Sequence, residues 1–109
     1  MISWSDFEKI DIRTGTIIAA SIFEKAKKPA YKMKIDFGEE GIKNSSAQIT
    51  VLYSVNELIG KQVIAIINFP PKQIADFMSE CLVLGVYNEN NDVVLLMPDK
   101  PTGNGRKIG

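Results

Sequence analysis

The segment from Tyr31 to Phe37 alternates strictly between apolar and polar side chains. Successive side chains of a β-strand point to opposite faces, so this pattern predicts a strand with one buried face and one solvated face. Gly-Glu-Glu-Gly at 38–41 predicts a turn, and residues 42–49 follow as a second strand with Ala47 and Ile49 on its buried face. The segment therefore indicates a β-hairpin with Lys32, Lys34 and Asp36 on its outer face.

Three further regions also favour strands. The run from Ile12 to Ile18 is rich in β-branched residues, and Gly15 within it suggests a bulge or a sharp bend. The apolar run 61–67 predicts a buried strand that ends before Pro70 and Pro71. Residues 81–87 and 93–97 predict two more strands, joined by the Asn-Glu-Asn-Asn turn at 88–91.

Two Ser-x-x-Glu sequences, at 5–8 and 54–57, are typical of helix N-termini and predict two short helices. Gly60 is expected to end the second helix. A chain of 109 residues is the size of one domain. The order of elements fits an all-β, five-stranded Greek-key barrel, the OB-fold, with a short helix between strands 3 and 4 and an N-terminal helical extension.

Missing residue types argue against an enzyme. The chain contains no histidine, which removes the commonest general base and metal ligand. Its one cysteine, Cys81, lies in an apolar run beside Glu80, whereas a reactive thiolate needs positive surroundings. We therefore expect Cys81 to be a core residue, and we expect no catalysis, no cofactor and no metal.

No targeting or membrane segment is recognisable, so the cytosol is the expected compartment and no membrane insertion is expected. The N-terminal residues contain acids where a signal peptide needs an apolar run. The longest uninterrupted apolar stretch, 63–67, is far shorter than the roughly 20 residues of a membrane helix.

The charge of the chain is balanced overall but uneven locally. Thirteen basic residues offset thirteen acidic ones, yet residues 25–35 hold five lysines and no acid, while residues 76–99 hold five acids and no base. A neutral protein with this distribution can carry a basic patch that attracts nucleic acid. The alternative is that both segments are ordinary solvated surface.

The outer face of the predicted hairpin combines Lys32 and Lys34 with Asn44, Ser46 and Gln48. Such groups suit phosphate oxygens and 2′-hydroxyls. Because the face has no aromatic residue for base stacking, it favours structured RNA over generic single strands. The alternative is the polar outer face that any half-exposed antiparallel strand has.

Four apolar side chains gather in and after the Pro-Pro loop, where complete burial of all of them is not expected: Phe69, Ile74, Phe77 and Met78. An exposed apolar patch of this kind marks a protein-interaction site. It predicts a site for unfolded or precursor polypeptides. The alternative is that these side chains line the mouth of the barrel as part of the core.

Several separated motifs resemble one family. Asp-Ile-Arg-Thr-Gly at 11–15, Asn-Phe-Pro-Pro-Lys at 68–72 and Ser-Glu at 79–80 occur in the order found in the tRNA-binding-domain family of OB-folds. The resemblance covers essentially the whole chain and is strongest to stand-alone members that act as export-related chaperones. It implies three kinds of partner: a second copy of the chain, tRNA, and unfolded or export-bound polypeptides, with the export machinery as a further partner.

The resemblance also implies RNA-contacting positions, which here are Lys32, Ser46, Gln48, Asn68, Lys72 and Ser79. Two residues depart from the family pattern. Asp76 stands where relatives commonly have Gly, and Leu82 stands where tRNA-binding members have Met. Because Asp76 places a negative charge near the expected site, polypeptide binding is the first functional prediction and tRNA binding the alternative.

In stand-alone members, N- and C-terminal additions to the barrel form the dimer contact. Residues 1–10 and 98–109 of this chain correspond to those additions. The resemblance therefore implies a homodimer built through Trp4, Phe7, Ile10 and Ile108. The alternative is that the N-terminal helix closes one end of its own barrel.

Overall fold

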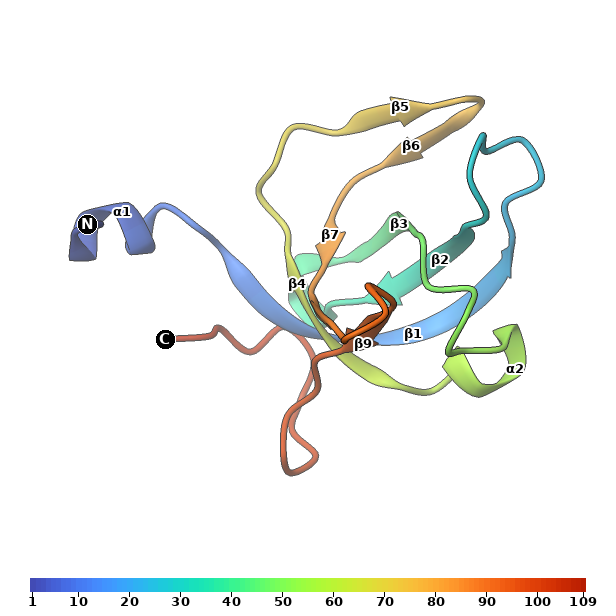
Figure 1. Cartoon of the computed structure of the whole chain (residues 1–109). Helices are drawn as coiled ribbons and strands as arrows, with labels where there is room; N and C mark the ends of the chain where they lie inside the picture. The colour runs from blue at the N-terminus through green and yellow to red at the C-terminus, as the bar shows by residue number, and fades with distance from the viewer.

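Five antiparallel strands wrap into a nearly closed barrel in the computed structural model, which describes residues 1–109 (Figure 1). The strand order is β3-β2-β1-β4-β7, so the long first strand lies at the centre of the sheet. This arrangement confirms the predicted all-β OB-fold. The bounds of these strands are β1 Ile12–Ile22, β2 Tyr31–Asp36, β3 Ile42–Ala47, β4 Gln62–Ile66 and β7 Leu82–Val83.

The alternation in β2 is reproduced as burial. Tyr31, Met33, Ile35 and Phe37 are all buried and belong to one hydrophobic cluster. Gly15 on β1 lies against this cluster, and a Cβ atom there would sit 2.6 Å from the Phe37 ring. Gly15 therefore permits close packing, and the β-bulge that was predicted near it lies instead between Ile17 and Ala19.

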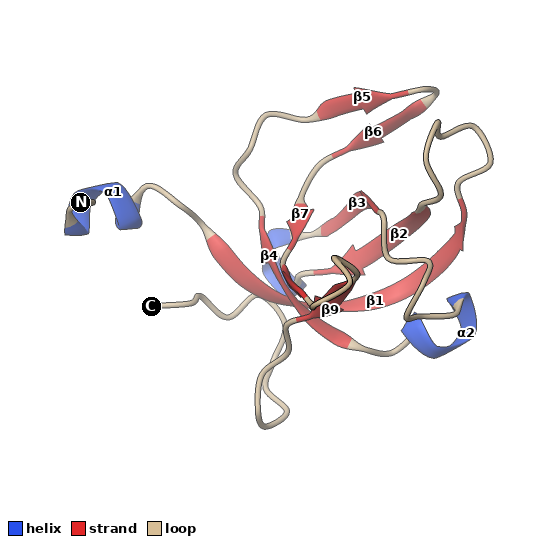
Figure 2. Ribbon diagram, viewed as in Figure 1, coloured by secondary structure: helices blue, strands red, loops and turns tan.

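The remaining elements are short (Figure 2). Two hairpins, β5-β6 and β8-β9, form separate two-stranded sheets. Their bounds, with those of the helices, are α1 Trp4–Glu8, the 3₁₀ turn Gly38–Glu40, α2 Val55–Leu58, β5 Lys72–Ile74, β6 Phe77–Ser79, β8 Gly85–Tyr87 and β9 Val93–Leu95.

Two details of the strand prediction were wrong. The β5-β6 hairpin was not predicted, because each strand has only three residues and no periodicity can develop over that length. The single strand expected at 81–87 divides after Val83, where β7 pairs with β4 and β8 pairs with β9.

The two helices begin at capping boxes and lie where they were predicted, but the capping residues of the first helix differ from those expected. Ser54 accepts from the Glu57 N–H, and the Glu57 side chain accepts from the Ser54 N–H, as expected. At the N-terminus the pair is Ser3 and Asp6, not Ser5 and Glu8. The expected Ser5 cap was wrong because the Ser-x-x-Asp sequence that begins two residues earlier forms the capping box, with the Ser3 and Asp6 N–H groups as donors.

The C-terminal tail lies along the first half of β1. The Thr14 N–H donates to the Arg106 carbonyl (3.0 Å), the Gly105 N–H donates to the Thr14 carbonyl (2.7 Å) and the Ile108 N–H donates to the Ile12 carbonyl (2.8 Å). The tail thus covers the edge of β1 that β2 leaves free. None of the helices has the length and apolar character required to cross a bilayer.

Candidate functional site

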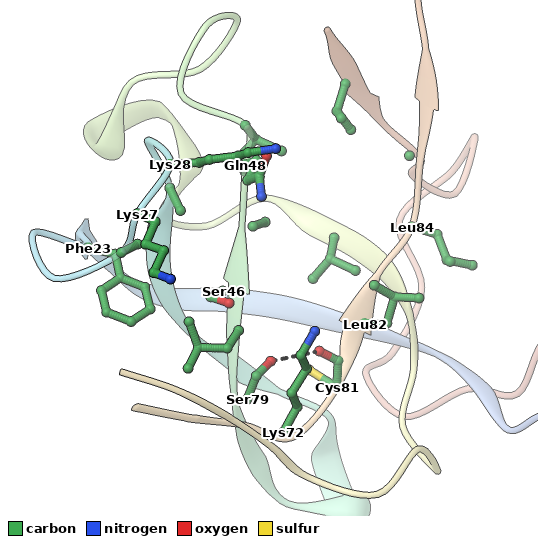
Figure 3. A pocket seen from close by; sticks show the side chains of 18 of the residues that line it. Phe23, Lys27, Lys28, Ser46, Gln48, Lys72, Ser79, Cys81, Leu82 and Leu84 are labelled. Atoms are coloured by element: carbon green, nitrogen blue, oxygen red, sulfur yellow. Dashed lines mark hydrogen bonds between the residues drawn. The ribbon is translucent and has the colours of Figure 1, made fainter. Parts of the chain in front are cut away.

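The two edge strands of the sheet, β3 and β7, meet along a seam where the barrel is only partly closed. At one end of the seam the Glu80 N–H donates to the Asn44 carbonyl (2.8 Å), and Ser45 Oγ donates to the Cys81 carbonyl (3.0 Å). Beyond Ser45 the strands separate and leave a groove of about 1120 Å³ (Figure 3). We refer to this space as the seam groove.

The floor of the seam groove is the open end of the hydrophobic core. Ile49 and Cys81 are buried members of the core cluster, and Val83, Val93 and Leu95 pack against that cluster while lining the groove. Anything that fills this end of the groove would complete the core.

Cys81 is a core residue, as predicted. Its side chain is buried, and burial raises the pKa of the thiol to about 11. The thiol is therefore neutral at physiological pH, and it lacks the thiolate character that nucleophilic chemistry needs.

The rim of the seam groove is basic. Lys25, Lys27, Lys28 and Lys72 line it, and no carboxylate does. Lys25 is paired with the Asp76 carboxylate (2.9 Å), and this hydrogen bond holds the pKa of Asp76 below its usual range. The other three form no ion pair within the chain. In Figure 3, Lys28 and Lys72 lie at opposite ends of the groove.

The groove brings together four of the seven predicted RNA-contacting residues, from β3, the loop after it, β5 and β6: Ser46, Gln48, Lys72 and Ser79. The other three do not line it. Lys32 Nζ lies over the rings of Phe23 (5.7 Å) and Phe77 (5.8 Å). Lys34 Nζ donates to Asn44 Oδ1 (3.1 Å).

The side chain of Asn68 links the start of β1 to the end of β4. Asn68 Oδ1 accepts from the Asp11 N–H (2.9 Å), and Asn68 Nδ2 donates to the Lys9 carbonyl (2.7 Å). Its amide is thus held by the chain that connects α1 to the barrel.

Of the predicted peptide-binding residues, only Ile74 lines the seam groove. Phe77 packs edge-to-face on Phe23, with ring centroids 5.4 Å apart, and so attaches the β5-β6 hairpin to the lysine-rich loop. Phe69 and Met78 are exposed outside the groove lining.

Sequence reasoning missed several groove residues because they come from segments that meet only in the folded chain. The lysines at 27 and 28 belong to the basic run noted above, but nothing local places that run beside Leu82, Leu84 or Tyr87. The residues of the groove are far apart in sequence, and the barrel closure alone brings them together.

Helix α1 and the C-terminus both extend outward from the same side of the barrel (Figure 1), and the four predicted dimer residues belong to these two terminal segments. Helix α1 buries none of its residues, and Trp4 is 82% exposed. Ile10 is also exposed, while Phe7 and Ile108 are half-buried.

Comparison with known proteins gives the class of this barrel. The family model described as a putative tRNA binding domain matches residues 12–107. The chain therefore belongs to the tRNA-binding-domain family of OB-folds.

Two solved structures are similar over the entire chain. The CsaA chaperone protein of Picrophilus torridus is 56% identical, with a TM-score of 0.94 and full coverage of both chains. The chaperone CsaA of Bacillus anthracis is 50% identical, with a TM-score of 0.95, covering all of this chain and 99% of that one.

Curated relatives include methionine–tRNA ligases. That of Methanococcoides burtonii is 35% identical over 108 residues, which are 99% of this chain and 16% of the ligase. That of Nanoarchaeum equitans is 37% identical over 99% of this chain and 14% of the ligase. The chain thus spans about one sixth of the length of these relatives.

Proposed function

We propose that this protein is a molecular chaperone that holds unfolded or export-bound polypeptides in the seam groove. The observation that carries the proposal is the open end of the core, a groove of about 1120 Å³ with an apolar floor and a basic rim. An extended apolar segment would cover that floor and remove its surface from water. The similarity to two CsaA chaperones over the whole chain supports the same conclusion.

The groove is suited to binding and offers little for catalysis. The Cys81 thiol that lines it is neutral, and the lining contains no carboxylate that could act as a general base. No group of three or more metal-ligating side chains occurs in the structure. We propose that the groove acts by binding alone.

Leu82 provides the direct test of polypeptide binding. Its side chain lines the groove and is 47% exposed, so Leu82→Asp adds a charge to the binding surface with little effect on folding. We expect the Kd for a reduced, carboxymethylated and permanently unfolded polypeptide, measured by fluorescence anisotropy, to rise at least about tenfold.

The matched control is Val51→Asp. Val51 is 72% exposed and lies outside the groove lining, so this variant should bind as the wild type does. Equal weakening by both substitutions, or no binding by the wild-type protein, would argue against the seam groove as a chaperone site.

A second candidate function is tRNA binding by the same rim. Lys27, Lys28 and Lys72 are free of ion pairs and border Ser46, Gln48 and Ser79, which can contact phosphate and ribose. The family assignment and the similarity to part of the methionine–tRNA ligases favour this candidate. Lys32 and Lys34 would add positive charge beside the groove.

We expect the tRNA affinity to fall steeply with salt, and Lys27→Ala to reduce the slope of log K against log salt by about one unit. The control is Lys100→Ala, an exposed lysine outside the groove. Titration of tRNA at salt concentrations between about 50 and 200 mM measures the slopes of both variants. If the Lys27 variant has the same slope as the wild type, the loop between β1 and β2 is not part of the RNA site.

We further propose that the protein is a homodimer joined through α1 and the adjoining C-terminal end. A helix of five residues cannot be stable alone, and α1 finds no burial within its own barrel. Trp4, Phe7, Ile10 and Ile108 would be covered by a second copy. Light scattering should give twice the mass of the 12.1 kDa chain, and Trp4→Glu should return it to the monomer value.

A further inference from the structure

The backbone of β3 has a free edge inside the seam groove. The Phe37 N–H donates to the Gly41 carbonyl, which makes Phe37 and Gly41 a hydrogen-bonded pair at the start of the β2-β3 ladder. In an antiparallel ladder such pairs alternate, so Ser45 and Ala47 face β2 and Ser46 between them faces away. The N–H and carbonyl of Ser46 form no hydrogen bond within the chain.

The opposite wall of the groove, β7, also has an unpaired backbone edge. The Leu84 N–H donates to the Ile64 carbonyl (2.8 Å), and Leu82 lies opposite Ile66 in the same ladder. Val83 between them therefore faces away from β4, and its N–H and carbonyl also have no partner in the chain. The seam groove is thus a break in a barrel, with unpaired strand edges on both sides.

We infer that the seam groove takes up its polypeptide as an added β-strand, paired with β3 at Ser46, and that it favours segments in which apolar residues alternate with acidic ones. This inference rests on the proposed polypeptide binding and specifies its mode and sequence preference. Strand addition satisfies the free N–H and carbonyl of Ser46, whichever side chains the bound segment carries.

The preference for alternating apolar and acidic residues follows from the different chemistry of the inner and outer sides of the groove. Side chains of an added strand would point alternately inward and outward. On the inner side they would meet the open core at Ile49, Val83 and Leu95. On the outer side they would meet the lysines of the rim, of which Lys27 and Lys28 lack an acidic partner. Apolar residues suit the first environment and carboxylates the second.

The unpaired strand edges favour a polypeptide over RNA as the occupant. Lysines attract phosphate and carboxylate alike, but an edge N–H and carbonyl with the spacing of a β-ladder match another β-strand. Among the groove-lining residues only Phe23 and Tyr87 are aromatic, and the Phe23 ring is already covered by Phe77 and Lys32.

The test removes one hydrogen-bond donor. Ser46→Pro eliminates the free N–H, yet it leaves the ladder to β2 intact because that N–H faces away from β2. The probe is a fluorescein-labelled short peptide in which valine alternates with glutamate. We expect Ser46→Pro to raise the Kd of this peptide at least about tenfold, because it removes a donor and places the proline ring against the incoming strand.

Two variants serve as controls. Ser46→Ala removes the hydroxyl but keeps the N–H, and Ile42→Pro places proline at the same kind of edge-facing position outside the groove. Both should bind the peptide within about threefold of the wild type. A peptide with lysine in place of glutamate should bind weakly to the wild-type protein.

Hydrogen exchange on the wild-type protein gives an independent readout. Saturation with the Val-Glu peptide should slow exchange of the Ser46 amide, whereas the Ala47 amide, which faces β2, should change little. Binding of the peptide with no protection at Ser46 and no effect of Ser46→Pro would overturn strand addition while leaving polypeptide binding intact. Failure to bind both this peptide and the unfolded polypeptide, with tRNA bound instead, would overturn both proposals.

Discussion

Replacing Phe37 with alanine is expected to lower the free energy of unfolding by about 3–5 kcal/mol. Phe37 is completely buried and is the largest of the fully buried side chains. Its ring lies over Gly15, where no side chain can move in to fill the cavity, and it packs beside Ile35, which is itself completely buried. The site therefore cannot collapse, and the cost of the cavity is retained.

Urea unfolding followed by circular dichroism measures this change. The matched control is Phe69→Ala, because Phe69 is 53% exposed in the loop after β4 and its removal should cost less than about 1 kcal/mol. A loss below about 1 kcal/mol in the Phe37 variant would mean that the core is not closed around this ring. For a domain of this size the expected loss is a large part of the total stability.

Gly105→Ala is expected to detach the C-terminal tail from β1 and to cost about 2–4 kcal/mol. Gly105 has a φ of +76°, and a Cβ atom there would lie against the Phe37 carbonyl oxygen, closer than van der Waals contact allows. The methyl group therefore adds backbone strain and a clash with an atom that cannot move. The hydrogen bonds that the tail makes to Thr14 would be lost.

Substitutions at two other glycines distinguish the effect of backbone strain from that of the steric clash. Gly41 has a φ of +92° but open space around its Cβ position, so Gly41→Ala reports the strain alone. Gly103 has neither a positive φ nor a contact closer than 3.9 Å, so Gly103→Ala should be neutral. Hydrogen exchange at the Thr14 amide should accelerate only in the Gly105 variant. Equal exchange in all three variants would show that the tail does not depend on this close approach.

The sequence predicted the barrel well because its main strands are long enough to show a period. Tyr31 to Phe37 alternate over seven residues, and the burial of every odd position follows from that pattern. The Ser54 capping box was also correct, since its hydrogen bonds span only three residues. By contrast, β5 and β6 have three residues each, and the sequence could not show that Phe77 would pack on Phe23.

The candidate site was only partly predictable for a similar reason. Ser46, Gln48, Lys72 and Ser79 were expected in a binding site and do line the seam groove. Asn68 was expected beside them, but its amide holds the connection to α1.

The strand pattern, the inward-facing side chains of the hairpin and the family motifs could all be recognised from the amino-acid sequence, because they depend on residues that are neighbours in the chain. The position at which the barrel stays open depends on contacts between segments that are distant in the chain. The backbones of Ser46 and Val83 are left unpaired because the bond from the Glu80 N–H to the Asn44 carbonyl is the only backbone hydrogen bond between β3 and the segment that leads into β7. Strand pairing across the seam is a long-range property, and no local pattern of side chains records which backbone edges are left unpaired.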